Sequence, residues 1–388
     1  MNQKCWRMLL LGMCVGLVAL ALPPHAMAID LDGIKVTPSI AYTGEYDDNL
    51  YRTQFNKRSD YVNTFSPGIA VEATPGNHSI KAGYKLDILK YTSHTNFDTY
   101  RHHADLVGIF KFNRVELRLK EDFRKTDDFP TSELTKRVKR NENFLSGGVD
   151  YDFIERWGIG LDFIWGDINN LHPDFDFLDR RTYTFATNIY YRITAKTRVF
   201  AEYDFVRELY RYDHTRTNNR YRGLIGVRGD LTERFNVTGK AGYEHLTFHT
   251  ARNDQDNFVT SIEANYKPVE RLGIGLILKR SVENSTFTNN AQYETFSSNL
   301  VLTYNFTPKL TILPRGSLGV DQYRESVLNI DRMEKRVDYN YGGGLGIRYT
   351  PQKWVVLEGG YDFTRRDSNF NTNDYDDNRV SFTVTLSM

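Results

Sequence analysis

The feature that most constrains the fold is an alternation of apolar and polar side chains with a period of two residues. In the last segment of the chain, Val380, Phe382, Val384, Leu386 and Met388 fall on one face, and the residues between them are polar. Apolar and charged residues alternate in the same way between residues 114 and 124. A period of two is typical of strands with two different faces, so we expect an all-β protein.

The connections between these segments alternate between short and long. Short turns are expected at residues 74–77, 112–113, 154–156, 194–196, 232–234, 268–270, 307–309 and 351–353. Long polar loops are expected at residues 47–59, 92–100, 126–140, 169–179, 211–219, 249–256, 285–291, 326–335 and 367–378. Short periplasmic turns that alternate with longer outer loops are the layout of outer-membrane barrels. Eight short and nine long connections predict about 18 strands, with both termini periplasmic; 16 strands remain an alternative, because residues 92–112 alternate poorly.

The composition favours strands that face lipid on one side and water on the other. Charged residues make up 26% of the chain and aromatic residues 14%, and no run of about 20 apolar residues follows residue 28. A soluble sandwich or solenoid is the alternative, but the strands carry one lipid-compatible and one charged face. Tyrosines expected to form interfacial girdles near strand ends are Tyr42, Tyr46, Tyr51, Tyr61, Tyr183, Tyr190, Tyr191, Tyr339, Tyr341 and Tyr349.

Residues 1–28 have the pattern of a signal peptide, and residues 29–388 are expected to form one outer-membrane β-barrel. Lys4 and Arg7 precede an apolar run, and a small-residue site predicts cleavage after Ala28. Lipoprotein processing at Cys14 is disfavoured, because no small residue precedes it and the cut would split the apolar run. Without Lys4 and Arg7, 48 of the 50 basic residues remain against 49 acidic ones. This near balance argues against a nucleic-acid partner.

The polar faces of the strands are expected to line the lumen of the barrel. The predicted lumen-lining residues are Arg114, Glu116, Arg118, Lys120, Asp122, Arg124, Glu202, Asp204, Arg222, Arg228, Lys240, Glu244, Arg315, Arg348 and Glu358. Their charges are of mixed sign, so no ring of one sign predicts ionic selectivity. Two interpretations remain open: a wet pore for polar solutes, or opposite charges that pair across neighbouring strands for structural reasons.

Motifs for catalysis, metal or cofactors are weak, so we predict neither an enzyme, nor a metal site, nor a cofactor. His102 and His103 are expected at the junction of a loop and a strand as solvated histidines. The clusters 47–49 and 374–378 offer oxygen ligands for Ca²⁺ but lack EF-hand spacing, which favours solvated turns. The glycine-rich run 342–346 lies within an expected strand, where close packing or curvature explains it better than phosphate binding.

Three motifs near the start of the barrel resemble the β-barrel porin 2 family. They are Glu45-Tyr46-Asp47-Asp48-Asn49-Leu50-Tyr51, Ser59-Asp60-Tyr61 and Phe65-Ser66-Pro67-Gly68. The resemblance implies an outer-membrane barrel, and members of the family are often associated with exopolysaccharide or capsule systems. One departure is the last residue, Met388, where outer-membrane barrels commonly carry an aromatic residue.

These observations predict a channel in the outer membrane of a Gram-negative bacterium. The resemblance implies a conduit for exopolysaccharide or another polar polymer, with polysaccharide and periplasmic export components as partners. Outer-membrane lipid and the barrel-assembly machinery are further expected partners. The alternatives are a general diffusion porin for small polar solutes, and an adhesin or structural barrel that acts through its outer loops.

Overall fold

The chain forms an antiparallel barrel. The computed structural model describes residues 29–31, 33–131, 133–250, 253–287, 290, 292–329 and 332–387; the predicted signal peptide with Ala28, and Met388, lie outside them. The strands are β1 (Ile29–Leu31), β2 (Ile34–Asp47), β3 (Asp60–Ala73), β4 (Ser79–Tyr91), β5 (Thr99–Lys111), β6 (Val115–Thr126), β7 (Arg140–Asp152), β8 (Trp157–Asn170), β9 (Arg180–Arg192), β10 (Thr197–Tyr210), β11 (Asn218–Thr232), β12 (Phe235–Phe248), β13 (Gln255–Val269), β14 (Leu272–Asn284), β15 (Gln292–Asn305), β16 (Leu310–Asn329), β17 (Arg332–Gln352), β18 (Val355–Ser368) and β19 (Tyr375–Ser387).

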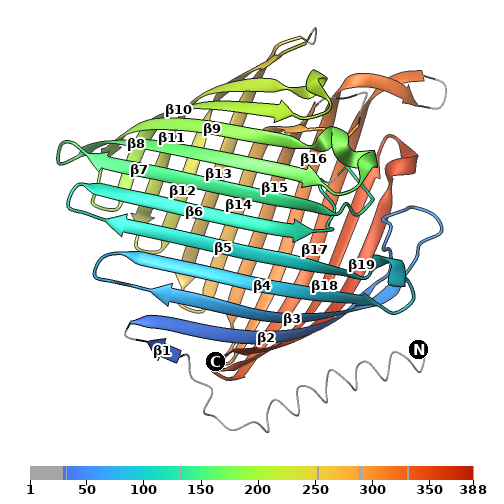
Figure 1. Ribbon diagram of the computed structural model, residues 1–388, viewed down its shortest axis with the longest axis horizontal. Helices are drawn as coiled ribbons and strands as arrows, with labels where there is room; N and C mark the ends of the chain where they lie inside the picture. The colour runs from blue at the N-terminus through green and yellow to red at the C-terminus, as the bar shows by residue number, and fades with distance from the viewer. Residues whose placement is uncertain are drawn as a thin grey trace.

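The barrel closes where β19 pairs with β2, in a register that runs from Arg379 opposite Asp47 to Ser387 opposite Ser39. Each strand from β2 to β18 also pairs with the next one along the chain, which gives 18 strands in the wall among the described residues (Figure 1). The short β1 adds a small hairpin to β2. The prediction of 18 strands is confirmed. The alternative of 16 is wrong, because β4 and β5 pair with each other and with their outer neighbours in spite of their poor alternation.

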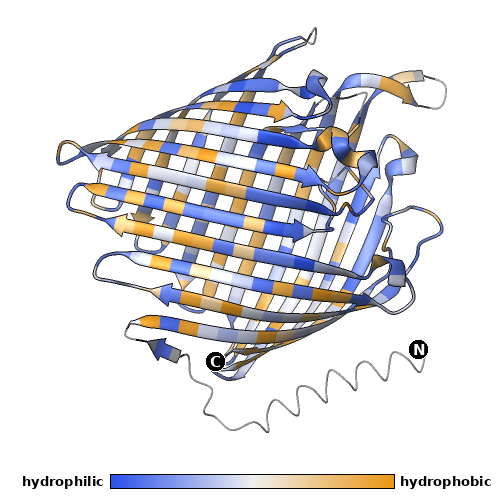
Figure 2. Cartoon of the chain, in the orientation of Figure 1, coloured by the Kyte–Doolittle hydropathy of each residue, from blue (hydrophilic) through white to orange (hydrophobic). Residues whose placement is uncertain are grey.

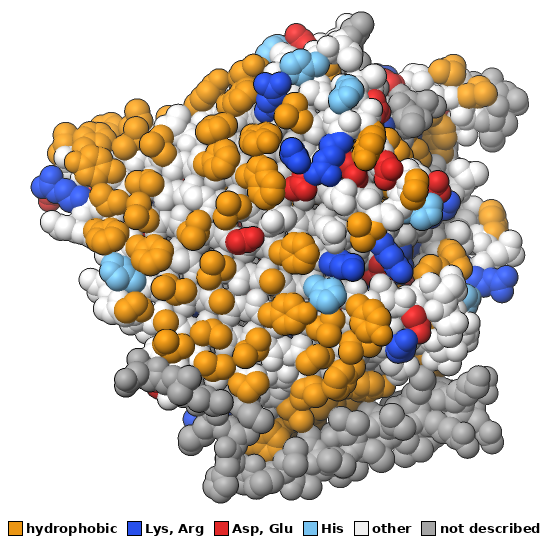
Figure 3. All heavy atoms as spheres, viewed as in Figure 1, with side chains coloured by type: hydrophobic (Ala, Val, Ile, Leu, Met, Phe, Trp, Pro, Cys, Tyr) orange, Lys and Arg blue, Asp and Glu red, His pale blue; other side chains and the backbone are white. Residues whose placement is uncertain are grey.

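The wall is apolar on its outside and mostly polar on its inside. Ile225 and Tyr243 are 71% and 70% exposed, whereas their chain neighbours Leu224 and Glu244 are 5% and 0% exposed. Figure 2 shows the same alternation along most strands, and Figure 3 shows apolar side chains spread over one outer face. A soluble protein would cover such a surface. Among the tyrosines predicted to form girdles, Tyr190 is an exception: it is 1% exposed and its hydroxyl donates to Asp152.

The strand connections follow the predicted alternation with one correction. Residues 326–335 were expected to form a long loop, but β16 and β17 run to Asn329 and from Arg332. Ser326 pairs with Lys335 and Leu328 with Met333, so this hairpin extends the two strands beyond the rim (Figure 1). The segment is rich in charges on both faces, and outside the membrane such strands show no apolar alternation.

Four short 3₁₀ helices lie in the long loops within the described residues: Thr95–Phe97, Pro173–Leu178, His214–Arg216 and Asn371–Asn373. In the part of the chain that the structure describes, no helix is long and apolar enough to span a membrane.

Candidate functional site: the polar inner wall and its loop

Charged side chains from separate strands converge on the polar face of the wall. Arg118 on β6 lies 2.9 Å from the carboxylate of Asp150 on β7 and 3.0 Å from that of Asp162 on β8. Arg198 on β10 reaches the same Asp150 at 3.1 Å, although two strands separate β10 from β7. Because neighbouring strands lie about 4.8 Å apart, side chains meet over such a span when they point toward the axis of the barrel. This face is therefore the inner one.

Most of the predicted lumen residues form ion pairs on this face. Direct partners in register are Arg222 with Glu244 and Arg348 with Glu358, each pair at 2.6 Å. Lys240 reaches Glu202 at 2.6 Å across an intervening strand. Further pairs are Arg315 with Asp362 at 2.6 Å, Arg124 with Asp122 at 2.7 Å and Arg118 with Glu116 at 3.5 Å. The structure thus brings opposite charges together as the structural interpretation expected, and a role in lining a pore stays a prediction.

The remaining four residues of that set are placed differently. Arg114 lies in the turn before β6 and is exposed, and Lys120 is also exposed. Arg228 lies over the ring of Phe200, with 5.6 Å between the guanidinium carbon and the ring centroid. Asp204 is 5% exposed, and its Oδ1 has no hydrogen-bond donor within the described residues. Asp204 therefore keeps acceptor capacity on the inner wall.

In two places, a glycine on the intervening strand allows oppositely charged side chains from the strands on either side to form an ion pair. Gly344 on β17 lies between Arg315 on β16 and Asp362 on β18, in register with both. A Cβ at Gly344 would lie 2.5 Å from Asp362 Oδ1 and 2.8 Å from Arg315 Nε. Gly148 on β7 has the same place between Arg118 and Asp162. The close packing predicted for the glycine-rich run is thus found at Gly344, where a side chain would separate the two charges.

Replacing Gly344 by alanine should destabilise the barrel by about 1–3 kcal/mol, because the new methyl group displaces the Arg315–Asp362 pair. Gly343→Ala is the matched control, since a Cβ there has no atom within 4 Å. Urea unfolding followed by tryptophan fluorescence measures both. Equal midpoints for the two variants would contradict this account of the glycine.

The loop between β6 and β7, residues 127–139, crosses the opening of the barrel; we call it the inward loop. Glu133 accepts hydrogen bonds from Ser285 Oγ at 2.7 Å and from Thr286 Oγ1 at 3.0 Å, in the loop between β14 and β15. Arg366 on β18 donates to the Glu133 carbonyl oxygen at 3.3 Å. Strands β6 and β15 are nine positions apart (15 − 6) in a ring of 18, and are therefore opposite each other. The inward loop consequently spans the mouth.

The inward loop is also held on its own side. The ring of Phe129 lies between two guanidinium groups, with Arg52 at 3.8 Å and Arg137 at 4.9 Å from its centroid. Arg101 on β5 pairs with Asp127 at 2.6 Å and with Asp128 at 2.9 Å. Stacked guanidinium groups and paired carboxylates fix both ends of the loop. The inward loop is therefore held in a fixed position at the mouth of the barrel.

A cavity of about 470 Å³ lies on the inner wall beneath this loop. Pro130 and Thr131 of the inward loop border it on one side, and Asp204, Arg222 and Lys240 of the wall border it on the other. Three of the lumen residues predicted from sequence thus share one cavity with the loop.

Burial raises the pKa of the Glu133 carboxyl group, and the hydrogen bonds from Ser285 and Thr286 oppose that rise without cancelling it. The pKa of Glu133 is therefore higher when the loop is docked than when the loop is free. Docking is most stable at a pH below the pKa that Glu133 has in the free loop. That stability is lost as the pH rises through the pKa of the docked state. Hydrogen exchange of the inward loop should therefore speed up, beyond the intrinsic pH effect, between acidic and alkaline pH.

Glu133→Gln supplies the control for this pH effect, because glutamine has nearly the same shape and does not ionise. In this variant the protection of the inward loop should not depend on pH. Persistent pH dependence in Glu133→Gln would assign the effect to another group.

His102 and His103 lie inside β5 and not at a junction of loop and strand, which corrects the prediction. His102 Nδ1 lies 2.9 Å from the Tyr84 hydroxyl on the outer face, and His103 Nε2 lies 3.4 Å from Asp122 on the inner face. Apolar and polar residues alternate poorly in β5, so the sequence did not show where this strand begins.

A closed barrel of this size, with an apolar outer wall and a polar inner one, defines the class of outer-membrane porins. The profile of the family described as "Putative beta-barrel porin 2" matches residues 33–155 and 165–388, which is most of the chain. The chain belongs to this family, as the resemblance predicted. The family and the fold are those of channel proteins in the outer membrane of Gram-negative bacteria.

Solved structures with the same fold include proteins of Pseudomonas aeruginosa and Acinetobacter baumannii. The outer membrane protein OpdK of Pseudomonas aeruginosa is 11% identical, with a TM-score of 0.50, over 91% of this chain and 99% of its own. OccAB3 of Acinetobacter baumannii is 10% identical, with a TM-score of 0.50, over 92% of this chain and 100% of its own. OccK2 (OpdF) of Pseudomonas aeruginosa is 13% identical, with a TM-score of 0.50, over 92% and 99%. At these identities the likeness shows the fold alone. No relative is found among curated proteins.

Proposed function

We propose that this protein is a diffusion channel for small polar solutes, narrowed at its mouth by the inward loop. The observation that carries the proposal is the contact of Glu133 with Ser285 and Thr286 on the far side of the mouth. A barrel of 18 strands is wide enough for an aqueous channel. A loop docked across it leaves passages for small solutes more readily than for a polymer chain. Export of exopolysaccharide, the first expectation from the resemblance, has no support from the described contacts.

The ion pairs of the inner wall are proposed as the lining of this channel. Carboxylate and guanidinium groups in close pairs present dipoles more than net charge, which suits neutral, hydroxyl-rich or zwitterionic solutes. The short turns and both ends of the barrel chain are proposed to face the periplasm, with lipid and the barrel-assembly machinery as partners.

Single-channel recording of the refolded mature protein in a planar bilayer tests the proposed function. We expect a steady conductance that small sugars reduce while they occupy the lumen. A barrel that inserts but conducts no ions would refute the diffusion channel and leave a structural barrel or an adhesin. Exchange of the outer loops would then abolish function, while changes in the inner wall would not.

Arg124→Glu should shift the channel toward cation selectivity, because it replaces a partly exposed guanidinium group by a second carboxylate beside Asp122. The reversal potential in a salt gradient reports this change. Insertion and heat resistance should stay as in the wild type, since Arg124 is not on the lipid face. An unchanged reversal potential would place Arg124 outside the conduction path.

A further inference from the structure

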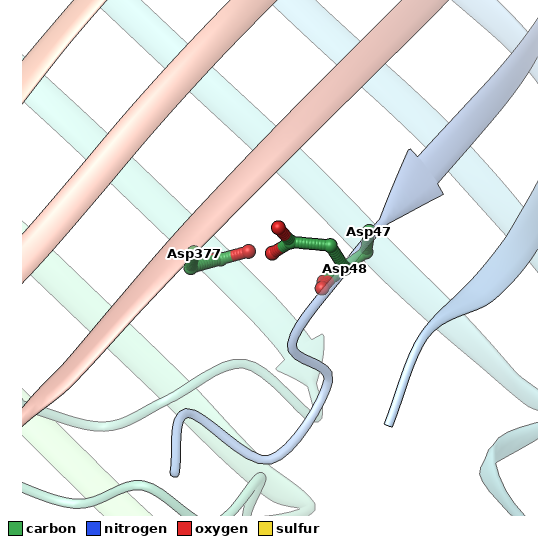
Figure 4. Close-up of side chains that lie close together, drawn as sticks. All are labelled: Asp47, Asp48 and Asp377. Carbon is green, nitrogen blue, oxygen red and sulfur yellow. The ribbon is translucent and has the colours of Figure 1, made fainter. Parts of the chain in front are cut away.

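Three aspartates from distant parts of the chain lie together at the rim, where β19 meets β2. Asp47 ends β2, Asp48 follows it, and Asp377 lies near the start of β19. One carboxylate oxygen from each lies within 4.8 Å of the other two. Figure 4 shows the Asp377 side chain directed from β19 toward the two aspartates at the end of β2. We call these residues the seam aspartates.

Two of the seam aspartates are almost fully buried. Asp47 is 3% exposed and Asp377 is 2% exposed, so the prediction of solvated turns is wrong for both. Asp377 Oδ1 is inaccessible to water and has no hydrogen-bond donor within the described residues. Burying two carboxylates side by side is costly unless a positive charge compensates them. Asp377 Oδ1 thus keeps acceptor capacity that the described residues do not use.

The neighbouring groups compensate only part of the charge. Arg379 Nε lies 3.5 Å from Asp377 Oδ2, at the limit of a hydrogen bond, and Arg52 acts on Asp377 electrostatically while it stacks on Phe129. Glu45 is a fourth carboxylate close to Asp47 and Arg379. Arg52 and Arg379 thus offset part of the negative charge of these four carboxylates.

The third seam aspartate is held in a fixed position. Asp48 Oδ1 accepts the backbone N–H of Asn378, and Asp48 Oδ2 accepts its side-chain amide, both at 2.7 Å. Asp47 Oδ1 accepts the N–H of Asn49 at 2.8 Å. These bonds use one lone pair of each oxygen, and a carboxylate oxygen can still bind a cation with the other. The seam aspartates are thus positioned before any ion arrives.

We propose that the seam aspartates form a Ca²⁺ site that fastens the last strand of the barrel to the first. Ca²⁺ binds oxygen ligands at 2.3–2.6 Å, so two ligands on opposite sides of the ion lie about 4.6–5.2 Å apart. The three oxygens lie within 4.8 Å of one another, so all of them can reach one Ca²⁺ ion at these distances. Mg²⁺ demands near-ideal octahedral geometry at about 2.0–2.1 Å and usually keeps several of its waters. A divalent ion also supplies positive charge beside three carboxylates.

The site also connects to the mouth. Asn49 donates to Thr53 O at 2.8 Å and to Asp376 O at 2.7 Å, which ties the segment after Asp48 to the start of β19. Arg52 belongs to this segment and stacks on Phe129 of the inward loop. Bound Ca²⁺ therefore stabilises both the seam and one anchor of the inward loop.

Thermal unfolding and Tb³⁺ luminescence of the refolded mature protein in detergent test this proposal. Ca²⁺ should raise the unfolding temperature relative to EDTA, and it should displace Tb³⁺ that is sensitised by nearby tyrosines. Asp377→Asn should weaken Tb³⁺ and Ca²⁺ binding at least about 10-fold, because one of three charged ligands is lost. Since the substitution removes a buried charge without changing shape, the barrel should fold and become more stable in EDTA.

Asp256→Asn is the control, because the Asp256 side chain is 83% exposed and lies at the start of β13, away from the seam. Its response to Ca²⁺ should equal that of the wild type. Three results would overturn the site: no effect of Ca²⁺ up to about 10 mM, which is about ten times the weakest Kd typical of extracellular sites; an equal Ca²⁺ effect in Asp377→Asn; or tighter binding of Mg²⁺ than of Ca²⁺. None of these readouts depends on conduction, so a negative result here would not contradict the proposed diffusion channel.

Discussion

Replacement of residues 128–138 by four glycine and serine residues is expected to raise the single-channel conductance by about twofold or more. The change removes Phe129, Glu133 and Arg137, and with them every contact that holds the inward loop across the mouth. The remaining turn joins β6 to β7 directly, which neighbouring antiparallel strands permit. An 18-strand barrel without such a loop has the width of an open aqueous channel.

Shortening the loop between β12 and β13 is the matched control for this experiment. Its described residues, 249–250 and 253–254, are exposed, so its loss should leave the conductance unchanged. If both deletions raised the conductance equally, the effect would reflect disturbance of the rim and not removal of the inward loop. If neither did, the inward loop would not be the constriction.

Leu119→Arg is expected to impair insertion of the barrel, with a cost of about 2–4 kcal/mol for an arginine on the lipid face near the midplane. Leu119 is 42% exposed on the outside of β6. Lys120→Arg is a closely matched control, since it places the same side chain one residue further on the opposite face. Folding yield in lipid vesicles, measured by heat-modifiable gel mobility, compares the two. Similar yields would mean that the inside and outside of this strand are assigned wrongly.

The wall of the barrel could be predicted from the sequence because lipid and water impose opposite demands on alternate residues. Segments such as 379–388 carry this contrast in every pair of neighbours, so the strands and their faces are visible locally. The part of the β16–β17 hairpin beyond Gln322 was not predicted, because this demand is absent there. Outside the membrane, neither face needs to be apolar, and the alternation disappears.

The mouth could not be predicted, because its contacts join residues far apart in sequence. Glu133 and Ser285 are 152 positions apart, and Asp48 and Asn378 are 330 apart. No local pattern distinguishes a loop that docks inside from one that stays in water. Tyr190 shows the limit on the wall itself: its position near a strand end suggested a girdle, yet it lies inside beside Asp152 and Arg198. Residues 126–140 were expected only to form a long polar loop, and their sequence did not show where that loop lies.

The pairing of β19 with β2 has a consequence for the order in which the barrel assembles. Every other pairing in the wall joins strands that are neighbours in the chain, whereas Thr43 and Thr383, whose hydroxyl oxygens are 2.8 Å apart, are separated by 340 positions. Closing a local hairpin costs little loop-closure entropy, whereas this last pairing has the largest closure cost of any pairing in the wall, and its hydrogen bonds form only at the end. Until then, β2 and β19 are two open edges, able to pair with other chains. The slow and aggregation-prone step of folding is therefore expected at the closing of the ring, and any agent that holds these two strands together should speed the whole process.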